Sequence, residues 1–381
     1  MSSQRYGIDL LVIGAGIVGA AIAHYAARAG LRVTVLEREA VAAGSTGAGE
    51  GNLLVSDKSP GPELDLAKSS LKLWRQLAEE APDAFEYEPK GGLVVTEDPA
   101  GVDALHETVR RQREAGVTVM AVTEPQDLEP HIRPGLAAAF YYPEDAQVMP
   151  ALAAAHLLAH PGVNVRLGVT VTGAITSRHG RMVGVTTSDG PYSCGTVVLA
   201  AGAAGGMLST ALGAPVPVTP RRGVVLVTTP VPKLIRHKVY TADYLGDITS
   251  DDARLQTSPV VESTAAGPVL IGASREHVGF DTSVAPEVWR RLAAGAVRLF
   301  PVLKKVAVVR AYSGFRPFSP DHLPIIGPDG RVPGLWHATG HEGAGVGLAA
   351  ATGHLLTQAI CGNDTDMDLS AFSPHRFEAP R

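Results

Sequence analysis

A glycine-rich hexapeptide near the amino terminus has the spacing of a phosphate-binding turn. Gly14-Ala15-Gly16-Ile17-Val18-Gly19 matches the pattern G-x-G-x-x-G and directly follows an apolar run. In such turns the first glycine allows the tight bend, the second lets the backbone approach a pyrophosphate, and the third lets the next helix pack against the strand. The helix amino terminus adds free N–H groups and a positive dipole. The hexapeptide predicts a dinucleotide site; the alternative is that its glycines serve packing alone.

A carboxylate lies where the ribose of such a cofactor would be bound. Glu37 stands 18 residues after Gly19, at the end of the next predicted strand, and Arg38 follows it. A carboxylate at this place accepts hydrogen bonds from the ribose diol and repels a 2′-phosphate. We therefore expect Glu37 and Arg38 to border the cofactor and NADP to be disfavoured. The alternative for Glu37 is an ordinary surface residue.

The elements that must position these residues form a β–α–β unit. Ile8–Ile13 and Arg32–Glu37 are apolar and β-branched, as expected of strands in a parallel sheet, and Ile17–Ala29 has the composition of a helix. Thr196–Gly202 and Gly334–Gly340 again resemble buried strands that end at glycine. We therefore expect the nucleotide-binding domain to be assembled from separated segments of the chain.

Length and composition indicate a two-domain globular protein. The chain has 381 residues, more than one hydrophobic core usually supports. Between residues 215 and 309, strand-like segments alternate with proline and glycine turns, which indicates an antiparallel second domain. The net charge of −5, without a basic stripe, argues against nucleic acid as a partner.

Two features bear on location and metals. The apolar stretch Leu10–Ala29 is interrupted by glycines, His24 and Arg28, so we interpret it as strand and helix and expect no membrane span and no signal peptide. Cys194 and Cys361 form no CxxC pair, which argues against a disulfide scaffold, a cysteine-rich zinc site or an iron–sulfur cluster in this chain. We expect a cytoplasmic protein without a metal site.

Further motifs, in the same order along the chain, carry a resemblance to a known family. They are Gly44-Ser45-Thr46-Gly47-Ala48-Gly49-Glu50-Gly51-Asn52, Thr196–Gly202, Gly314-Phe315-Arg316-Pro317 with Pro324-Ile325-Ile326-Gly327, and Ala338-Thr339-Gly340-His341 with Gly345. With these motifs the chain resembles the D-amino acid oxidase (DAO) family, which includes glycine and sarcosine oxidases. Ser274-Arg275-Glu276 and Gly279-Phe280-Asp281 are most similar to flavoprotein subunits of hydrogen cyanide synthase and of opine or D-hydroxyproline dehydrogenases.

The resemblance implies an α/β fold: a Rossmann-like, doubly wound FAD-binding domain of the glutathione-reductase type and an antiparallel substrate domain. It assigns residues 1–84, 148–219 and 316–381 to the FAD domain, and 85–147 and 220–315 to the substrate domain. Some relatives hold the flavin through a cysteine where this chain has Gly314, so non-covalent FAD is expected.

The resemblance also implies which residues touch FAD. Val171 would meet the adenine side by its backbone, and Ala201 and Gly202 would pass near the pyrophosphate and ribitol. A glycine-rich turn before the last helix would place a helix amino terminus where negative charge on a reduced flavin is stabilised. The residues expected at the flavin are Ser45, Thr46, Gly51, Asn52, Leu53, Gly343, Gly345, Val346 and Gly347.

Family members oxidise the C–N bond of an amino acid by hydride transfer from the α-carbon to flavin N5, which gives an imine. Arg316, in its Arg-Pro pair, matches the carboxylate-binding arginine of glycine oxidase; the alternative is a buried structural ion pair. A guanidinium that holds the carboxylate by two hydrogen bonds orients the α-C–H. Gln256 replaces a tyrosine of glycine oxidase, so Tyr240 and Tyr244 are the candidates for shaping the pocket.

Two residues, Arg275 and His341, have two possible roles each. Arg275 replaces a methionine of glycine oxidase, and it either meets a second substrate carboxylate, as an opine has, or forms a structural ion pair with Glu276. His341 either hydrogen-bonds near the flavin or holds the glycine-rich turn.

The electron acceptor is inferred from the resemblance. Leu270 aligns with the lysine that sarcosine oxidases place over the flavin for the reaction with oxygen, which favours a dehydrogenase. Such an enzyme would need a partner subunit with a second flavin or an iron–sulfur centre. The alternatives are a self-sufficient oxidase that forms H2O2, an NAD-dependent dehydrogenase, and a flavin-holding subunit without activity.

Overall fold

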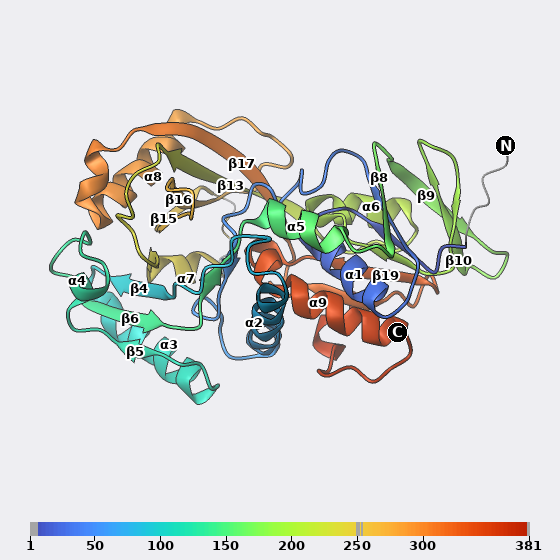
Figure 1. Cartoon of the computed structure of the whole chain (residues 1–381), viewed down its shortest axis with the longest axis horizontal. Helices are drawn as coiled ribbons and strands as arrows, with labels where there is room; N and C mark the ends of the chain where they lie inside the picture. Colours follow the sequence, from blue (N-terminus) through green and yellow to red (C-terminus); the bar gives the residue numbers. More distant parts are fainter. Residues whose placement is uncertain (1–6, 249–251, 253, 379–381) are drawn as a thin grey trace.

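The computed structural model describes residues 7–248, 252 and 254–378. Two large sheets occupy opposite halves of the molecule (Figure 1). One half contains α1 (Ile17–Arg28) and α9 (Gly345–Ile360), and the other contains α8 (Pro286–Leu299). The segments that build each half come from distant parts of the chain, as expected.

The first sheet has six strands, and its four inner strands, together with β8 at one edge, run parallel. In spatial order the strands are β18 (Ile325–Pro328), β19 (Leu335–Thr339), β12 (Val197–Leu199), β1 (Leu10–Ile13), β2 (Val33–Glu37) and β8 (Val163–Leu167). The side chains of β1 and β12 are all buried, because helices cover this sheet. The predicted β–α–β unit is therefore confirmed, with β1 two residues and β2 one residue shorter than expected.

The second sheet has eight strands and is antiparallel except at one pairing. In spatial order they are β17 (Val308–Phe318), β13 (Thr219–Thr228), β16 (Val269–Arg275), β15 (Gln256–Ser263), β14 (Lys238–Thr241), β4 (Gly92–Thr96), β6 (Ala138–Tyr142) and β5 (Met120–Ala121). The expectation of an antiparallel sheet needs one correction, because β14 and β4 pair in parallel. The expectation of strands and turns alone in this region is also wrong, because α8 covers the sheet through Val288, Leu292, Ala296 and Leu299.

Smaller elements complete the fold. The short strands are β9 (Val171–Thr176), β10 (Met182–Thr187) and β11 (Tyr192–Ser193) in one sheet, and β3 (Asn52–Leu53) with β7 (Ala146–Gln147) in a ribbon. The other helices are α2 (Pro62–Glu80), α3 (Val102–Glu114), α4 (Pro125–Leu128), α5 (Pro150–Leu158), α6 (Gly205–Ala211) and α7 (Asp243–Ile248). The domain boundaries stay a prediction. Strand β17 runs across the predicted boundary between residues 315 and 316.

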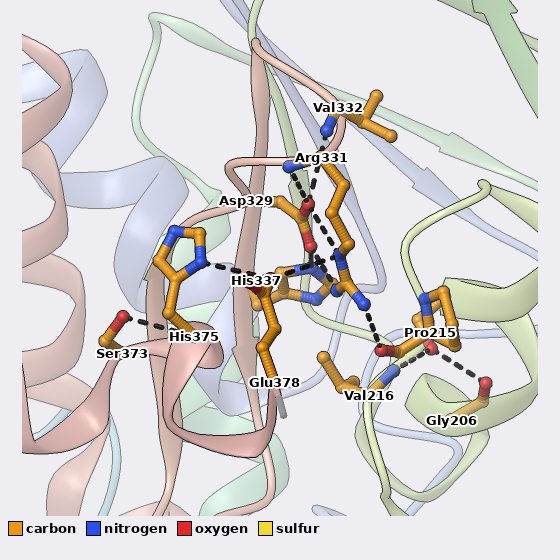
Figure 2. Close-up of polar contacts among 11 residues, drawn as sticks. Gly206, Pro215, Val216, Asp329, Arg331, Val332, His337, Ser373, His375 and Glu378 are labelled. Carbon is orange, nitrogen blue, oxygen red and sulfur yellow. Dashed lines mark hydrogen bonds and ion pairs between the residues drawn. The ribbon is translucent and has the colours of Figure 1, made fainter. Parts of the chain in front are cut away.

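A buried polar cluster fixes the β18–β19 hairpin (Figure 2). Asp329 accepts hydrogen bonds from the backbone N–H groups of Arg331 and Val332, at 2.8 and 3.2 Å, and pairs with His337 Nε2 at 2.9 Å. Although burial raises the pKa of Asp329, hydrogen bonds from His337 and Arg331 hold it well below its usual range. Because the cluster lies near the start of β19, it holds the strand whose far end leads to the glycine-rich turn at 340–347.

Two absences can be stated for the part of the chain that the structure describes. There, no helix is both long and apolar enough to span a bilayer. In the same residues, no group of three or more His, Cys, Asp or Glu side chains is arranged to hold a metal ion.

Candidate active site

Positions 14 and 19 of the first glycine turn have room only for glycine. Gly14 has φ +111°, and a Cβ there would lie 2.5 Å from the carbonyl oxygen of Ala200. A Cβ on Gly19 would overlap the carbonyl oxygen of Gly14, because α1 packs directly against the turn. Thr46 Oγ1 accepts the N–H of Ile17 at 2.9 Å and also faces Gly16. The turn thus leaves room for a phosphate at the positive end of α1, whose first turn, including Val18, has no acidic residue.

The predicted ribose carboxylate lies against this turn. Glu37 accepts the N–H of Ala15 at 2.9 Å and the N–H of Glu39 at 2.9 Å. Val169 donates its N–H to the Glu37 carbonyl at 2.9 Å, which brings the segment before Val171 beside the end of β2. Arg38 is exposed and pairs with Glu39 at 3.1 Å.

The loop from Ser45 to Asn52 contacts both halves of the molecule. The Ser45 hydroxyl donates to the Phe315 carbonyl in β17, and a Cβ on Gly314 would overlap Ala48. Gly51 has φ +87° and lies directly against the Val148 carbonyl, so a side chain at this position has no space. The loop is therefore held closely between β17 and the segment that follows β7.

Two more glycine turns meet this loop. A Cβ on Gly202, which follows Ala201 after β12, would lie 3.5 Å from Ser45 Oγ. A Cβ on Gly347, in the first turn of α9, would lie 3.2 Å from the Asn52 carbonyl, next to Leu53. Gly345 and Val346 begin α9, whose first turn has no acidic residue. The expected flavin residues thus converge, and the glycine cradles and two helix amino termini fit FAD.

His341 is held inside this region. It is 3% exposed, and its Nε2 lies 3.2 Å from Thr352 Oγ1 on α9. Burial lowers the pKa of His341 to about 3, so its imidazole is neutral at physiological pH. The contact with Thr352 favours the role of holding the turn.

Arg316 lies deep in the protein beside the turn before α9. A Cβ on Gly343 would lie 3.5 Å from Arg316 Nε. The guanidinium donates to the Ser274 carbonyl at 2.8 Å, yet Arg316 keeps part of its surface accessible. Burial, with a further contribution from the neighbouring Arg275, lowers the pKa of Arg316 to about 10. Among the described side chains, no carboxylate lies within ion-pair distance of Arg316, which argues against the structural ion pair.

The two candidate tyrosines have different surroundings. Tyr244, on α7, lines a small cavity together with Asn52, Lys58, Gly343 and Gly347. Tyr240 is fully buried, and its hydroxyl contacts Ser56 Oγ at 2.7 Å. Its ring packs against that of Tyr244 with centroids 5.0 Å apart. This arrangement favours Tyr244 for substrate contact and leaves Tyr240 as its support.

Several charged residues near the site were not predicted from the sequence. Arg221, fully buried on β13, pairs in register with Arg316 and lies 3.7 Å from Glu342. Lys58 lines the cavity and pairs with Asp57 at 2.5 Å. These side chains come from segments without a motif, so no signal in the sequence could have identified them.

A buried ionic cluster supports the flavin loop from the substrate side. Lys238 Nζ lies 3.5 Å from Glu50 and 3.5 Å from Glu262, and the lysine is 2% exposed. Glu50 also accepts Asn52 Nδ2 at 3.0 Å. The cluster therefore links the Glu50–Asn52 segment to β14 and β15.

Removing the central cation of this cluster should destabilise the protein. In Lys238→Met, Glu50 and Glu262 lose their shared partner while they remain buried, and we expect the free energy of unfolding to fall by about 3–5 kcal/mol. Urea unfolding followed by tryptophan fluorescence measures it. Lys233→Met is the control, because that side chain is 60% exposed and should contribute little. A loss below about 1 kcal/mol for Lys238→Met would show that the cluster is not a supporting element.

Comparisons with known proteins agree with this geometry. The family model described as "FAD dependent oxidoreductase" (DAO) matches residues 9–359. The chain is 31% identical over 379 residues to glycine oxidase of Pseudomonas putida, covering 96% of this chain and 98% of that protein. It is 30% identical over 419 residues to hydrogen cyanide synthase subunit HcnC of Pseudomonas aeruginosa, covering 97% and 96%.

A solved structure supports the same assignment. The crystal structure of glycine oxidase from Geobacillus kaustophilus superimposes with a TM-score of 0.89 and 26% identity, over 98% of this chain and 100% of that one. The family match confirms the α/β fold and the FAD cofactor that the sequence predicted. The chain belongs to the DAO family of FAD-dependent oxidoreductases.

Proposed function

We propose that this chain oxidises the C–N bond of an amino acid or secondary amine that is glycine-like, a D-imino acid or an opine. The observation that carries the proposal is Arg316, a cation on β17 that lies beside Gly343, one of the residues that line the cavity, in the turn before α9. No carboxylate of the described chain pairs with it. A desolvated guanidinium without a protein counter-ion is suited to a substrate carboxylate.

The residues of the chain would position the substrate. Bound FAD supplies the hydride acceptor, N5, and an imine is the product. Arg316 would hold the carboxylate by two hydrogen bonds, which restricts the direction of the α-C–H. The ring of Tyr244 would limit the space around the substrate and exclude water. The amino terminus of α9 would favour negative charge on the reduced ring.

We further propose that electrons pass to a partner subunit with a second flavin or an iron–sulfur centre. By the resemblance to sarcosine oxidases, Leu270 on β16 would stand where those enzymes have their oxygen-activating lysine, and one relative is a subunit of a larger enzyme by name. A self-sufficient oxidase that forms H2O2 is the second candidate, because another relative is a glycine oxidase. The cytoplasmic location stays a prediction.

The flavin is proposed to be held without a covalent bond. Gly314 contacts Ala48 of the flavin loop and has no side chain to form a bond. Cys194 is buried beside the carbonyls of Ile8 and Thr196, and Cys361 directly follows the carboxyl end of α9. Acid precipitation should therefore release all of the yellow colour into the supernatant.

Anaerobic reduction tests the function. The purified holoprotein is mixed without oxygen with glycine, sarcosine, the isomers of proline and hydroxyproline, and opines, while flavin absorbance is followed. We expect one of these compounds to bleach the flavin, and recolouring in air to be much slower than with an artificial electron acceptor. Fast recolouring in air would identify the oxidase instead. If no amino acid or amine bleaches the flavin, the proposed reaction is wrong.

A further inference from the structure

A second guanidinium lies beside the proposed carboxylate site without an anionic partner. Arg275 ends β16 and is 4% exposed, and its guanidinium carbon lies 4.5 Å from the centre of the Tyr244 ring. Tyr244 also lines the cavity together with Gly343, and a Cβ on Gly343 would lie 3.5 Å from Arg316 Nε. Arg316 donates to the carbonyl of Ser274, the residue before Arg275, at 2.8 Å, so the two arginines lie close together, next to residues that line this cavity.

Glu276, the carboxylate next to Arg275 in the sequence, forms its ion pair with Arg222 instead. Glu276 pairs with Arg222 Nη2 at 2.5 Å, and Glu276 and Arg222 also exchange backbone hydrogen bonds at 2.8 and 3.1 Å. Among the side chains that the structure describes, those of residues 7–246, 252 and 254–378, no carboxylate lies within ion-pair distance of Arg275. The structural ion pair between Arg275 and Glu276, one of the two alternatives from the sequence, is therefore not formed.

Arg275 and Arg316 are neighbouring cations that form no ion pair with any described side chain, and burying such a pair of like charges is unfavourable. Arg275 is one of the groups that lower the pKa of Arg316, which shows that the two guanidinium groups repel each other. The charge of Glu50 acts on the pKa of Arg316 in the opposite direction, but Glu50 forms no ion pair with either arginine and lies 3.5 Å from Lys238. Binding one carboxylate would leave one of the two arginines unneutralised, whereas two carboxylates would neutralise both.

We propose that the substrate is an amino acid with two carboxylates, one bound by Arg316 and the other by Arg275 over the Tyr244 ring. This inference rests on the proposed function and narrows its substrate class. The second carboxylate belongs either to the substituent on nitrogen, as in an imino diacid, or to the amino acid side chain. Arg275 is a specificity-determining residue in both cases.

The test measures binding, so it does not depend on turnover. Sulfur analogues, in which a thioether replaces the amine, are titrated into the holoenzyme while the flavin spectrum is followed. Thiodiacetate and (methylthio)acetate form the first pair, which tests a second carboxylate on the nitrogen substituent. 2-(Methylthio)succinate and 2-(methylthio)propionate form the second pair, which tests a second carboxylate on the amino acid side chain. In one of the two pairs, we expect the dicarboxylate to bind about tenfold more tightly than the monocarboxylate.

Substitution of Arg275 should remove that preference. In Arg275→Met the affinity ratio of the pair should fall to about one, and Arg275→Lys should keep part of it because charge remains without the planar fork. Arg290→Met on α8, whose side chain is 74% exposed, is the control and should keep the full ratio. FAD content and melting temperature show that each variant is folded.

The outcomes separate this inference from the proposed function. Equal affinities within both pairs in the wild-type protein, or an unchanged ratio in Arg275→Met, would overturn the dicarboxylate assignment while leaving amine oxidation intact. Failure of every amino acid and amine to bleach the flavin would overturn the proposed reaction, whatever the binding ratios are.

Discussion

Arg316→Met is expected to lower kcat/KM for anaerobic flavin reduction by roughly a thousandfold, which corresponds to about 4 kcal/mol of lost transition-state binding. The physical reason is that the substrate loses both its counter-ion and the two hydrogen bonds that orient it. Arg316→Lys keeps the charge but loses the planar fork, so its loss should be smaller, roughly a hundredfold. Stopped-flow reduction with the substrate identified above measures both variants.

The same substitution should not weaken the fold. Methionine removes a desolvated cation that lies near Arg275, so the melting temperature of Arg316→Met should equal or exceed that of the wild-type protein. Arg310→Lys is the matched control, because Arg310 lies on the same strand with its side chain exposed. Reduction of Arg316→Met at the wild-type rate would exclude Arg316 from substrate binding.

Gly19→Ala is expected to abolish FAD binding. The added methyl group would overlap the Gly14 carbonyl oxygen, so α1 must move away from the turn that receives the pyrophosphate. We expect the purified variant to be colourless and to bind added FAD at least about a hundredfold more weakly, since the whole phosphate site is displaced. Titration of the apoprotein with FAD, followed by fluorescence quenching, gives the dissociation constants.

A second glycine provides the control for that experiment. Gly195 has no neighbouring atom within 4 Å of the position that a Cβ would take, so Gly195→Ala should bind FAD like the wild-type protein. If Gly19→Ala also retained its flavin with wild-type affinity, the glycine turn would not be the pyrophosphate site.

The FAD half of the fold was predictable because its signals are local. Gly14, Gly16 and Gly19 lie within six residues, and the strands beside them are buried on both faces, so their sequences are mostly apolar. The substrate half was predicted less well. The parallel pairing of β14 with β4 joins residues about 146 positions apart, Lys238 and Gly92, and no local pattern records such a pairing. The helix α8 was missed although the local signal was present, because Val288, Leu292, Ala296 and Leu299 recur with helical spacing.

By itself, the sequence determined the dinucleotide turn, the FAD family and the arginine that matches a carboxylate-binding residue, since each depends on residue types within a short segment. Only the tertiary structure decided between the two alternatives for Arg275, because Glu276, its neighbour in sequence, pairs with Arg222 from another strand. It also brought Lys238 to Glu50 and Tyr244 to Arg275. Charge neutralisation depends on distance in space, and contacts between distant strands and loops set that distance.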